Sequence, residues 1–186
     1  MRDIAEIRTE RLWLRRLRLS DAPRVARFCG DPGVAGMILY APTPYLGIAA
    51  EGWIMSVNAC AQAGRDVVFA ADLDGEGLIG VIGAHAGRDD KYEVGYWFGR
   101  PYWGRGLATE TLTGFLAHAR KLGTLEAGHF VDNPASGRVL QKGGFAYTGE
   151  SENLYSLGRG ERVACRRMRY PGERTCAAAQ EAVVAR

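Results

Sequence analysis

A glycine-containing turn is the segment with the clearest chemical potential. It lies within the run from Tyr96 to Thr109, where aromatic strand-like residues precede Gly104 and Gly106 and a helical pattern follows. Both glycines can adopt a positive φ, and neither places a Cβ between the backbone and a ligand. The N–H groups at the start of the helix then suit a phosphate or pyrophosphate. The alternative is that glycine serves only the shape of the turn.

Two common nucleotide-binding motifs do not fit this turn. A P-loop requires Gly-Lys followed by Ser or Thr, whereas Gly104 is followed by Arg105 and Gly106. A dinucleotide fingerprint requires G-x-G-x-x-G after an early parallel strand, and this pattern is also missing. An anion bound here therefore belongs to another class of ligand.

The turn resembles the coenzyme A pyrophosphate loop of the GNAT superfamily, written [QR]-x-x-G-x-[GA]. Residues Trp103 to Ala108 match its last two positions, but Trp103 stands where Gln or Arg is usual. The departure removes one side chain that could face a phosphate. The runs Glu93–Phe98 (EVGYWF) and Tyr102–Glu110 (YWGRGLATE) are similar to the branch that contains the ribosomal-protein N-terminal acetyltransferases.

A second block extends this resemblance. Residues Asn133 to Phe145 match the branch's N-x-x-S-x-R-V-L-x-K-x-G-F, and Thr9–Leu12 and Leu19–Ala22 also fit, so the likeness covers about residues 9 to 170. It implies an α+β fold with a mixed, largely antiparallel seven-stranded sheet flanked by about four helices. It also implies acetyl transfer from acetyl-coenzyme A, a cosubstrate, to an amine, without a metal.

The resemblance implies a site between two strands that separate. In this superfamily the pantetheine lies in that gap like an extra strand, which here falls within Gly95–Phe98, and a backbone N–H of Trp97 or Phe98 would meet the oxyanion. Ordinary strand packing of these aromatic side chains is compatible with that role. The implied coenzyme A-binding residues are Tyr96, Trp97, Phe98, Trp103, Gly104, Arg105, Gly106, Leu107, Ala108, Thr109, Asn133, Ser136 and Arg138.

Two side chains are the candidate catalytic residues. Leu140 occupies the position of the tyrosine acid of many superfamily members, so Ser136, which matches the serine credited with that role in the branch, becomes the candidate acid. Glu93 matches the branch's proposed base, acting directly or through water, and His85 is a weaker alternative. The competing interpretations are a surface serine and a solvent-facing carboxylate. Asn133 could equally be the N-cap of a helix.

Hydrophobic periodicity and turn residues predict the elements around these positions. Strands are expected at residues 11–19, 67–73, 78–84, 92–98, 125–131, 144–149 and 162–170. Helices are expected at 21–28, capped by Ser20, and at 46–63, 108–122 and 134–142, with a loop over 30–45. Residues 1–172 form one expected domain, and 173–186 an expected frayed tail.

Composition narrows the functional class. The 186 residues carry a net charge of only +3, which gives no reason to expect nucleic acid, and no apolar stretch is long enough for a membrane span. Arginines gather between Arg159 and Arg174, which we interpret as a solvated edge strand, with an acidic partner as the alternative. The four cysteines lack CxxC spacing, and the three histidines lack metal-site spacing. We expect a cytoplasmic protein, with a homodimer as the default.

The acceptor follows from proton energetics. A peptide α-amine has a pKa of about 8 and lysine one of about 10.4, a difference of about 3 kcal/mol in the cost of deprotonation. A site without an evident strong base therefore favours a protein or peptide N-terminus. A small-molecule amine or antibiotic is the rival acceptor, and a non-catalytic acyl-coenzyme A sensor is the rival of another class.

Overall fold

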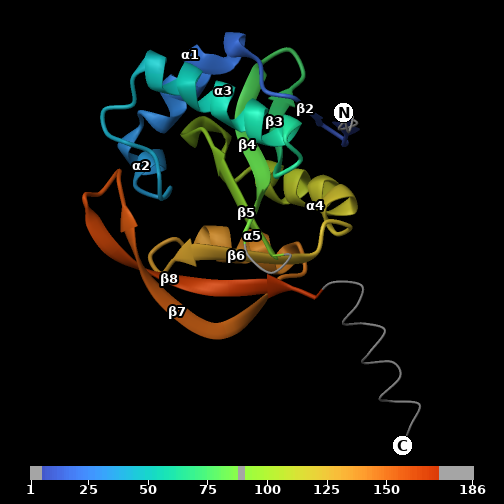
Figure 1. The fold of residues 1–186 in the computed structure, drawn as a ribbon, viewed down its shortest axis with the longest axis vertical. Helices are drawn as coiled ribbons and strands as arrows, with labels where there is room; N and C mark the ends of the chain where they lie inside the picture. The colour runs from blue at the N-terminus through green and yellow to red at the C-terminus, as the bar shows by residue number, and fades with distance from the viewer. Residues whose placement is uncertain (1–5, 88–90, 172–186) are drawn as a thin grey trace, which may run out of the picture.

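One mixed sheet organises the chain in the computed structural model, which describes residues 6–87 and 91–171. Its eight strands lie in the order β1-β2-β3-β4-β5-β6-β8-β7 (Figure 1). They are β1 (Ile7–Arg8), β2 (Leu12–Arg15), β3 (Asp66–Leu73), β4 (Gly77–Ala86), β5 (Lys91–Phe98), β6 (Thr124–Phe130), β7 (Ala146–Ser156) and β8 (Glu161–Tyr170). Every neighbouring pair is antiparallel except β5 and β6. The predicted fold class is confirmed.

The expected count of seven strands was one too low. The additional strand is β1, which pairs with β2 through Ile7↔Leu14 and Arg8↔Trp13. Two residues are too short a run to show the alternation by which strands are recognised. The strand expected at 144–149 also continues to Ser156, because its pairing with β8 resumes after a register shift.

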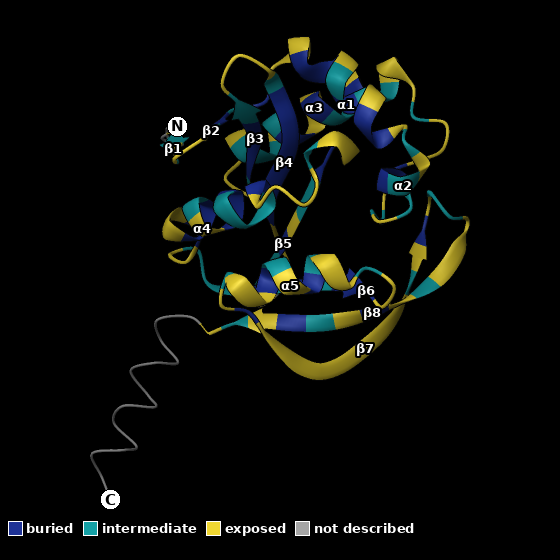
Figure 2. Ribbon diagram, turned by 180° about the vertical axis from the view of Figure 1, so that it is seen from behind, coloured by how far each residue is buried: buried dark blue, intermediate teal, exposed yellow. Residues whose placement is uncertain are grey.

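Helices cover both faces of the sheet. They are α1 (Ala22–Cys29), α2 (Pro32–Ala35), α3 (Gly47–Gln62), α4 (Leu107–Ala119) and α5 (Pro134–Lys142). In β3, Val68 and Ala70 join the core that includes α1 and α3, whereas Phe69 and Ala71 join the core that includes α4. This double burial explains why β3 reads as an unbroken apolar run. In Figure 2, β4 is buried along most of its length and β7 is exposed along most of its own.

Three local predictions were wrong. The loop expected over 30–45 contains α2, which begins at Pro32 with the Asp31 carboxylate accepting a hydrogen bond from the N–H of Gly33 at 2.8 Å. Ser20 does not cap α1: it lies in a 3-10 turn, η1 (Leu19–Asp21), and Asp21 precedes the helix. The arginine-rich segment is not an edge strand, because β8 lies between β6 and β7.

Some expectations lie outside the described residues, namely the tail at 173–186 and part of the loop before β5. Within residues 6–87 and 91–171, no helix combines the length and apolar character needed to cross a bilayer.

A buried arginine joins the first strand to its surroundings. Arg15 is 4% exposed. It donates to both carboxylate oxygens of Asp21 at 2.8 Å and to Oδ2 of Asp72 at 2.6 Å. Burial alone would raise the pKa of Asp21, but hydrogen bonds from Arg15 and from the N–H of Arg18 lower it on balance. Strand β2 thus ends at Arg15, earlier than the expected residue 19, and Arg15 contacts the N-cap residue of α1, Asp21.

The first prediction concerns this ion pair. Asp21→Ala leaves Arg15 buried without its bidentate partner and should lower the free energy of unfolding at pH 7 by about 3–5 kcal/mol, measured in urea. Glu51→Ala, which removes an exposed carboxylate from α3, should change it by less than about 0.5 kcal/mol.

The stability that the Arg15–Asp21 pair contributes depends on pH. Because folding depresses the pKa of Asp21, its contribution is present above the unfolded value of about 3.9 and is lost as the pH falls through the folded value. The difference in free energy of unfolding between wild type and Asp21→Ala should therefore become smaller as the pH falls into the acid range. Equal stability of the Asp21 and Glu51 variants at pH 7 would contradict this account.

Candidate active site

Strands β5 and β6 separate part of the way along their length. They pair in parallel from Lys91↔Thr124 to Val94↔Ala127. Beyond that point β5 stays paired with β4 as far as Phe98, while β6 stays paired with β8 as far as Phe130. Figure 1 shows β5 running toward the α1 side while β6 follows β8. The divergence lies between Gly95–Phe98 and Gly128–Phe130, and it leaves backbone groups of β5 without a strand partner on the β6 side. The family resemblance implied a gap between strands at Gly95–Phe98.

The glycine turn has the backbone conformation that the sequence indicated. It follows a 3-10 turn, η2 (Arg100–Tyr102), and both Gly104 and Gly106 have positive φ angles, 72° and 77°. A Cβ added at Gly104 would meet nothing within 4 Å, so the space beside the turn is open. Leu107, 1% exposed, anchors the start of α4 in the core. The first N–H groups of α4 are thus held in place beside open space.

Trp103 has a structural contact where the family usually has a charged or amide side chain. Its indole N–H donates to the carbonyl of Phe98 at 2.7 Å, and 46% of the residue is exposed. The guanidinium of Arg105 lies 5.7 Å from the ring centroid of Tyr102. Trp103 therefore fastens the turn to the last residue of β5 without offering a charge.

The N-terminal segment also holds the start of α4. Glu110 accepts hydrogen bonds from the Thr9 hydroxyl at 2.6 Å, the Arg11 N–H at 2.8 Å and the Arg11 side chain at 2.7 Å. Burial would raise the pKa of Glu110, but these hydrogen bonds lower it overall. The sequence motifs around Thr9 and Glu110 were noted separately, and nothing local indicated that they touch.

An open groove of about 600 Å³ lies beside this contact. Among the residues that line it are Arg8, Arg11, Gly106, Thr109, Thr113 and Lys142. Of the ten lining residues three are basic and two, Glu10 and Glu110, are acidic, and Arg11 is paired with Glu110 at 2.7 Å. The groove reaches the first turn of α4. The groove therefore adjoins the N-terminal end of that helix, where the helix dipole is positive.

Asn133 and Ser136 lie together at the start of α5. The Asn133 side chain accepts from the Ser136 N–H at 3.2 Å, so Asn133 is the N-cap. Arg138, also on α5, is exposed. Leu140 is 1% exposed in the core, which is consistent with the loss of an acid at that position.

A pair of hydroxyl groups spans the divergence, and sequence reasoning missed it. The Tyr96 hydroxyl on β5 lies 2.9 Å from the carbonyl oxygen of Ser136 and 2.9 Å from its Oγ. Because a phenol has one proton, donation to the carbonyl requires Ser136 Oγ to donate to Tyr96. Burial raises the pKa of Tyr96 to about 12, partly offset by the Ser136 hydrogen bond, so the phenol keeps its proton at neutral pH.

Glu93 lies on the other face of β5 from Tyr96, since side chains alternate along a strand. Both of its carboxylate oxygens accept from Arg167 of β8, at 2.9 and 2.6 Å, and its side chain is 45% exposed. The hydrogen bond to Glu93 is the main cause that raises the pKa of Arg167. The two candidate catalytic side chains are therefore not brought together: Ser136 contacts the Tyr96 face of β5, and Glu93 projects from the opposite face.

The remaining candidates are less involved. His85 Nδ1 lies 2.9 Å from Asp66 Oδ2, in register with Glu93 across β4 and β5. No group of three His, Cys, Asp or Glu side chains in the described parts of the chain is arranged to hold a metal ion.

Known proteins resemble this chain in sequence and in fold. A curated relative, the uncharacterized N-acetyltransferase p20 of Bacillus licheniformis, is 31% identical over 110 residues, covering 56% of this chain and 60% of the relative's length. A structure of RimL, a ribosomal L7/L12 alpha-N-protein acetyltransferase, in complex with coenzyme A has a TM-score of 0.74 at 17% identity, covering 88% of this chain and 97% of RimL.

A second structure has the same fold. The microcin C7 self-immunity acetyltransferase MccE, in complex with acetyl-CoA and AMP, has a TM-score of 0.74 at 14% identity, covering 86% of this chain and 92% of the other. At such identities the likeness establishes the fold alone. The model of the acetyltransferase (GNAT) domain matches residues 11–146, which is most of the chain. The protein therefore belongs to the GNAT acetyltransferase family.

Proposed function

We propose that the protein transfers an acetyl group from acetyl-coenzyme A to a primary amine, with a protein or peptide N-terminal α-amine as the preferred acceptor. The observation that carries this proposal is the divergence of β5 from β6 directly before the glycine turn, with Tyr96 and Ser136 joined across it. RimL and MccE, which share the fold, have coenzyme A or acetyl-CoA bound.

The glycine turn and the groove would hold the phosphates of coenzyme A. Backbone N–H groups between Gly104 and Thr109 suit the pyrophosphate, because they lie at a helix N-terminus beside open space. Arg8 and Lys142 add positive charge along the adjoining groove, whereas Arg11 is paired with Glu110 there. The pantetheine would then run along Gly95–Phe98, where β5 lacks its β6 partner.

The reaction would take place at the divergence. The neutral amine attacks the thioester carbonyl, the oxyanion accepts a hydrogen bond from the N–H of Trp97 or Phe98, and the C–S bond breaks. Ser136 Oγ, turned from Tyr96 toward the sulfur, donates its proton to the departing thiolate; Tyr96 then passes its proton to Ser136 and regains one from water. No metal and no covalent enzyme intermediate are required by this scheme.

The proton lost by the amine leaves on the opposite face of β5. Glu93 lies there, but its two oxygens already accept from Arg167. If Glu93 acts as the base, it would take the amine proton through a bridging water molecule. Such an arrangement is a weak base, which favours an amine that is already partly neutral at pH 7.

A test of the coenzyme A site uses charge. Thr109→Glu places a carboxylate in the first turn of α4, where the helix dipole tolerates it but a pyrophosphate is repelled. The dissociation constant for coenzyme A by calorimetry should rise about tenfold or more, because a like charge at about 4 Å costs about 1–4 kcal/mol. Ala117→Glu, about two turns further along α4 and exposed, should have little effect. Equal affinities would remove this site.

A test of the proton donor uses Ser136→Ala. Loss of a group that acts in the transition state should lower kcat by about 10²-fold while coenzyme A affinity stays nearly constant. Ser151→Ala, the same change at an exposed position of β7, serves as the control. A loss below about threefold would make Ser136 a packing or binding residue instead.

A test of the acceptor compares two peptides, one with a free N-terminus and no lysine, the other with a blocked N-terminus and a free lysine. We expect a higher kcat/KM for the α-amine, because less energy is needed to deprotonate it. Equal or reversed values would reject the N-terminal preference. Reaction only with small amines would favour an activity of the antibiotic-modifying type, and coenzyme A binding without any turnover would favour a sensor.

A further inference from the structure

The tip of the β7–β8 hairpin is docked on the segment after α2. The Leu157 N–H donates to the Leu39 carbonyl at 2.9 Å, and the Ser156 hydroxyl donates to the Ile38 carbonyl at 3.3 Å. A Cβ added at Gly158 would lie 2.5 Å from the Ala35 carbonyl oxygen, so the two backbones are in direct contact there. We call this contact between residues 156–159 and residues 35–39 the bridge.

Arg159 is the side chain at the centre of the bridge. Its Nε donates to the Gly36 carbonyl at 2.5 Å, and its two terminal nitrogens donate to the Asp132 carboxylate at 2.6 and 3.1 Å. The guanidinium lies 4.9 Å from the ring centroid of Phe130, and the side chain is 18% exposed. Only a planar guanidinium offers donors in this forked arrangement, so lysine cannot reproduce it.

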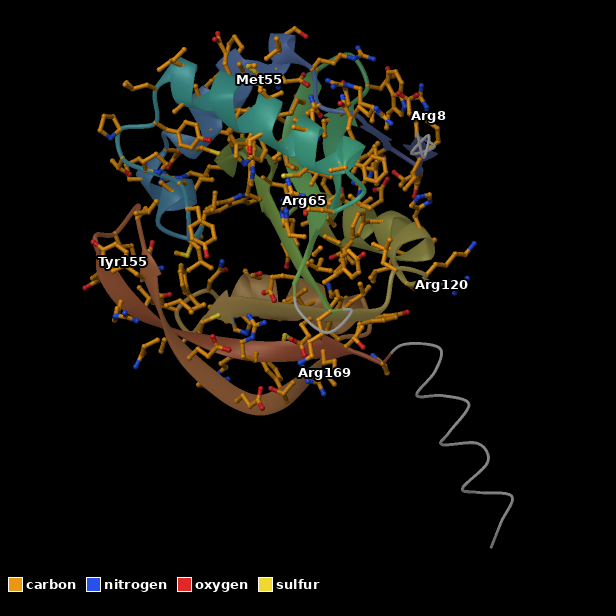
Figure 3. All side chains as sticks on the ribbon, viewed as in Figure 1. Arg8, Met55, Arg65, Arg120, Tyr155 and Arg169 are labelled. Carbon is orange, nitrogen blue, oxygen red and sulfur yellow. The ribbon has the colours of Figure 1, made fainter. Side chains whose placement is uncertain are left out.

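The partners of Arg159 come from the two sides of the divergence. Phe130 ends β6 and Asp132 follows it, whereas Gly36 ends α2, next to α1 and hence on the β4–β5 side. In Figure 1 the hairpin tip rises to α2 at the end where β5 and β6 are far apart, and in Figure 3 Tyr155 marks that end and Arg169 the other. Arg159 therefore joins the β6 side to the β5 side beyond the divergence.

Two separate contacts thus join the two sides of the divergence. At one end, Val94 and Ala127 are neighbours in the sheet. At the other end, the bridge is oriented by the bidentate Arg159–Asp132 pair. The Asp132 side chain is 55% exposed, so the attraction of charges alone contributes little there. The Arg159–Asp132 pair acts by orienting the guanidinium, so that Nε points at the Gly36 carbonyl.

We propose that Arg159 is a specificity-determining positioning residue, which holds the two sides of the divergence at the separation that admits a peptide N-terminus to the thioester. The proposal rests on the proposed acetyl transfer. To the preference that the amine pKa sets, it adds a geometric condition, which depends on a contact remote from the reacting atoms. A small change in the geometry of two reactants is sufficient to alter rates strongly, because reaction requires close and aligned approach.

Arg159→Met tests this inference, with Arg159→Lys as a second variant that keeps the charge. The matched control is Arg162→Met, since Arg162 donates to the Asn153 carbonyl within the hairpin. The first measurement is hydrogen exchange of the Leu157 amide, which reports the bridge whether or not any acceptor is known. Arg159→Met should make this amide exchange faster, and Arg162→Met should not.

The second measurement is kcat/KM for the free-N-terminus peptide and for the blocked lysine peptide. Arg159→Met should lower the first value about tenfold or more and reduce the preference for the α-amine, while the dissociation constant for coenzyme A changes less than about twofold. Arg159→Lys should show the same changes to a smaller extent.

Two results would overturn the inference: unchanged exchange at Leu157, or faster exchange with an unchanged acceptor preference. If Arg159→Met does not fold, Arg159→Lys decides between the same outcomes. If the wild type acetylates no amine, the proposed function fails and the acceptor role of Arg159 fails with it. The exchange measurement then still shows whether Arg159 holds the bridge.

Discussion

Strand β5 is bound to β4 along its whole length but to β6 over only four residue pairs, and the candidate site depends on this inequality. Packing keeps the far half of β5 with β4: a Cβ at Gly80 would come within 2.5 Å of both the Phe98 ring and the Trp97 carbonyl. Trp97 also packs against the core that contains α1 and α3. Meanwhile β6 follows β8 through Phe130. The parallel pair cannot continue, so backbone groups of β5 remain for a ligand.

The elements around the divergence complete the site because each is anchored elsewhere. The glycine turn is fastened to β5 by Trp103 and to the N-terminal segment by Glu110. Helix α5 begins at its Asn133 cap and presents Ser136 to Tyr96. A site held on rigid elements can keep a reacting geometry that loops alone would not maintain.

Local signals predicted much of this arrangement. Gly104 and Gly106 indicated the turn, Asn133 and Pro134 indicated the start of α5, and apolar runs located the inner strands. Local signals failed where a side chain from a distant element decided the structure. Ser20 looks like an N-cap, but the buried Arg15 engages Asp21 and places a 3-10 turn there. Likewise, no periodicity predicts a two-residue strand such as β1.

The candidate site was predicted unevenly for the same reason. The family resemblance indicated Ser136 and Glu93, yet their partners lie 40 and 74 residues away in sequence, and Arg159 contacts a carbonyl 123 residues away. Neither motif spacing nor composition predicts contacts between residues so far apart in the sequence. The sequence therefore indicated which residues to consider. The three-dimensional structure was needed to show that Ser136 lies against one face of β5 and that Glu93 projects from the other face.

We propose that acetyl-CoA binds along β5 beyond the point where β6 diverges from it. The most direct test of this proposal is a titration of the isotope-labelled protein with acetyl-CoA, followed by the amide resonances of Gly95, Trp97 and Phe98 and those of the glycine turn. We expect large changes in chemical shift at Trp97 or Phe98 together with Gly104–Thr109, since these N–H groups would gain ligand acceptors. Binding that leaves both segments unchanged and shifts resonances elsewhere would contradict it.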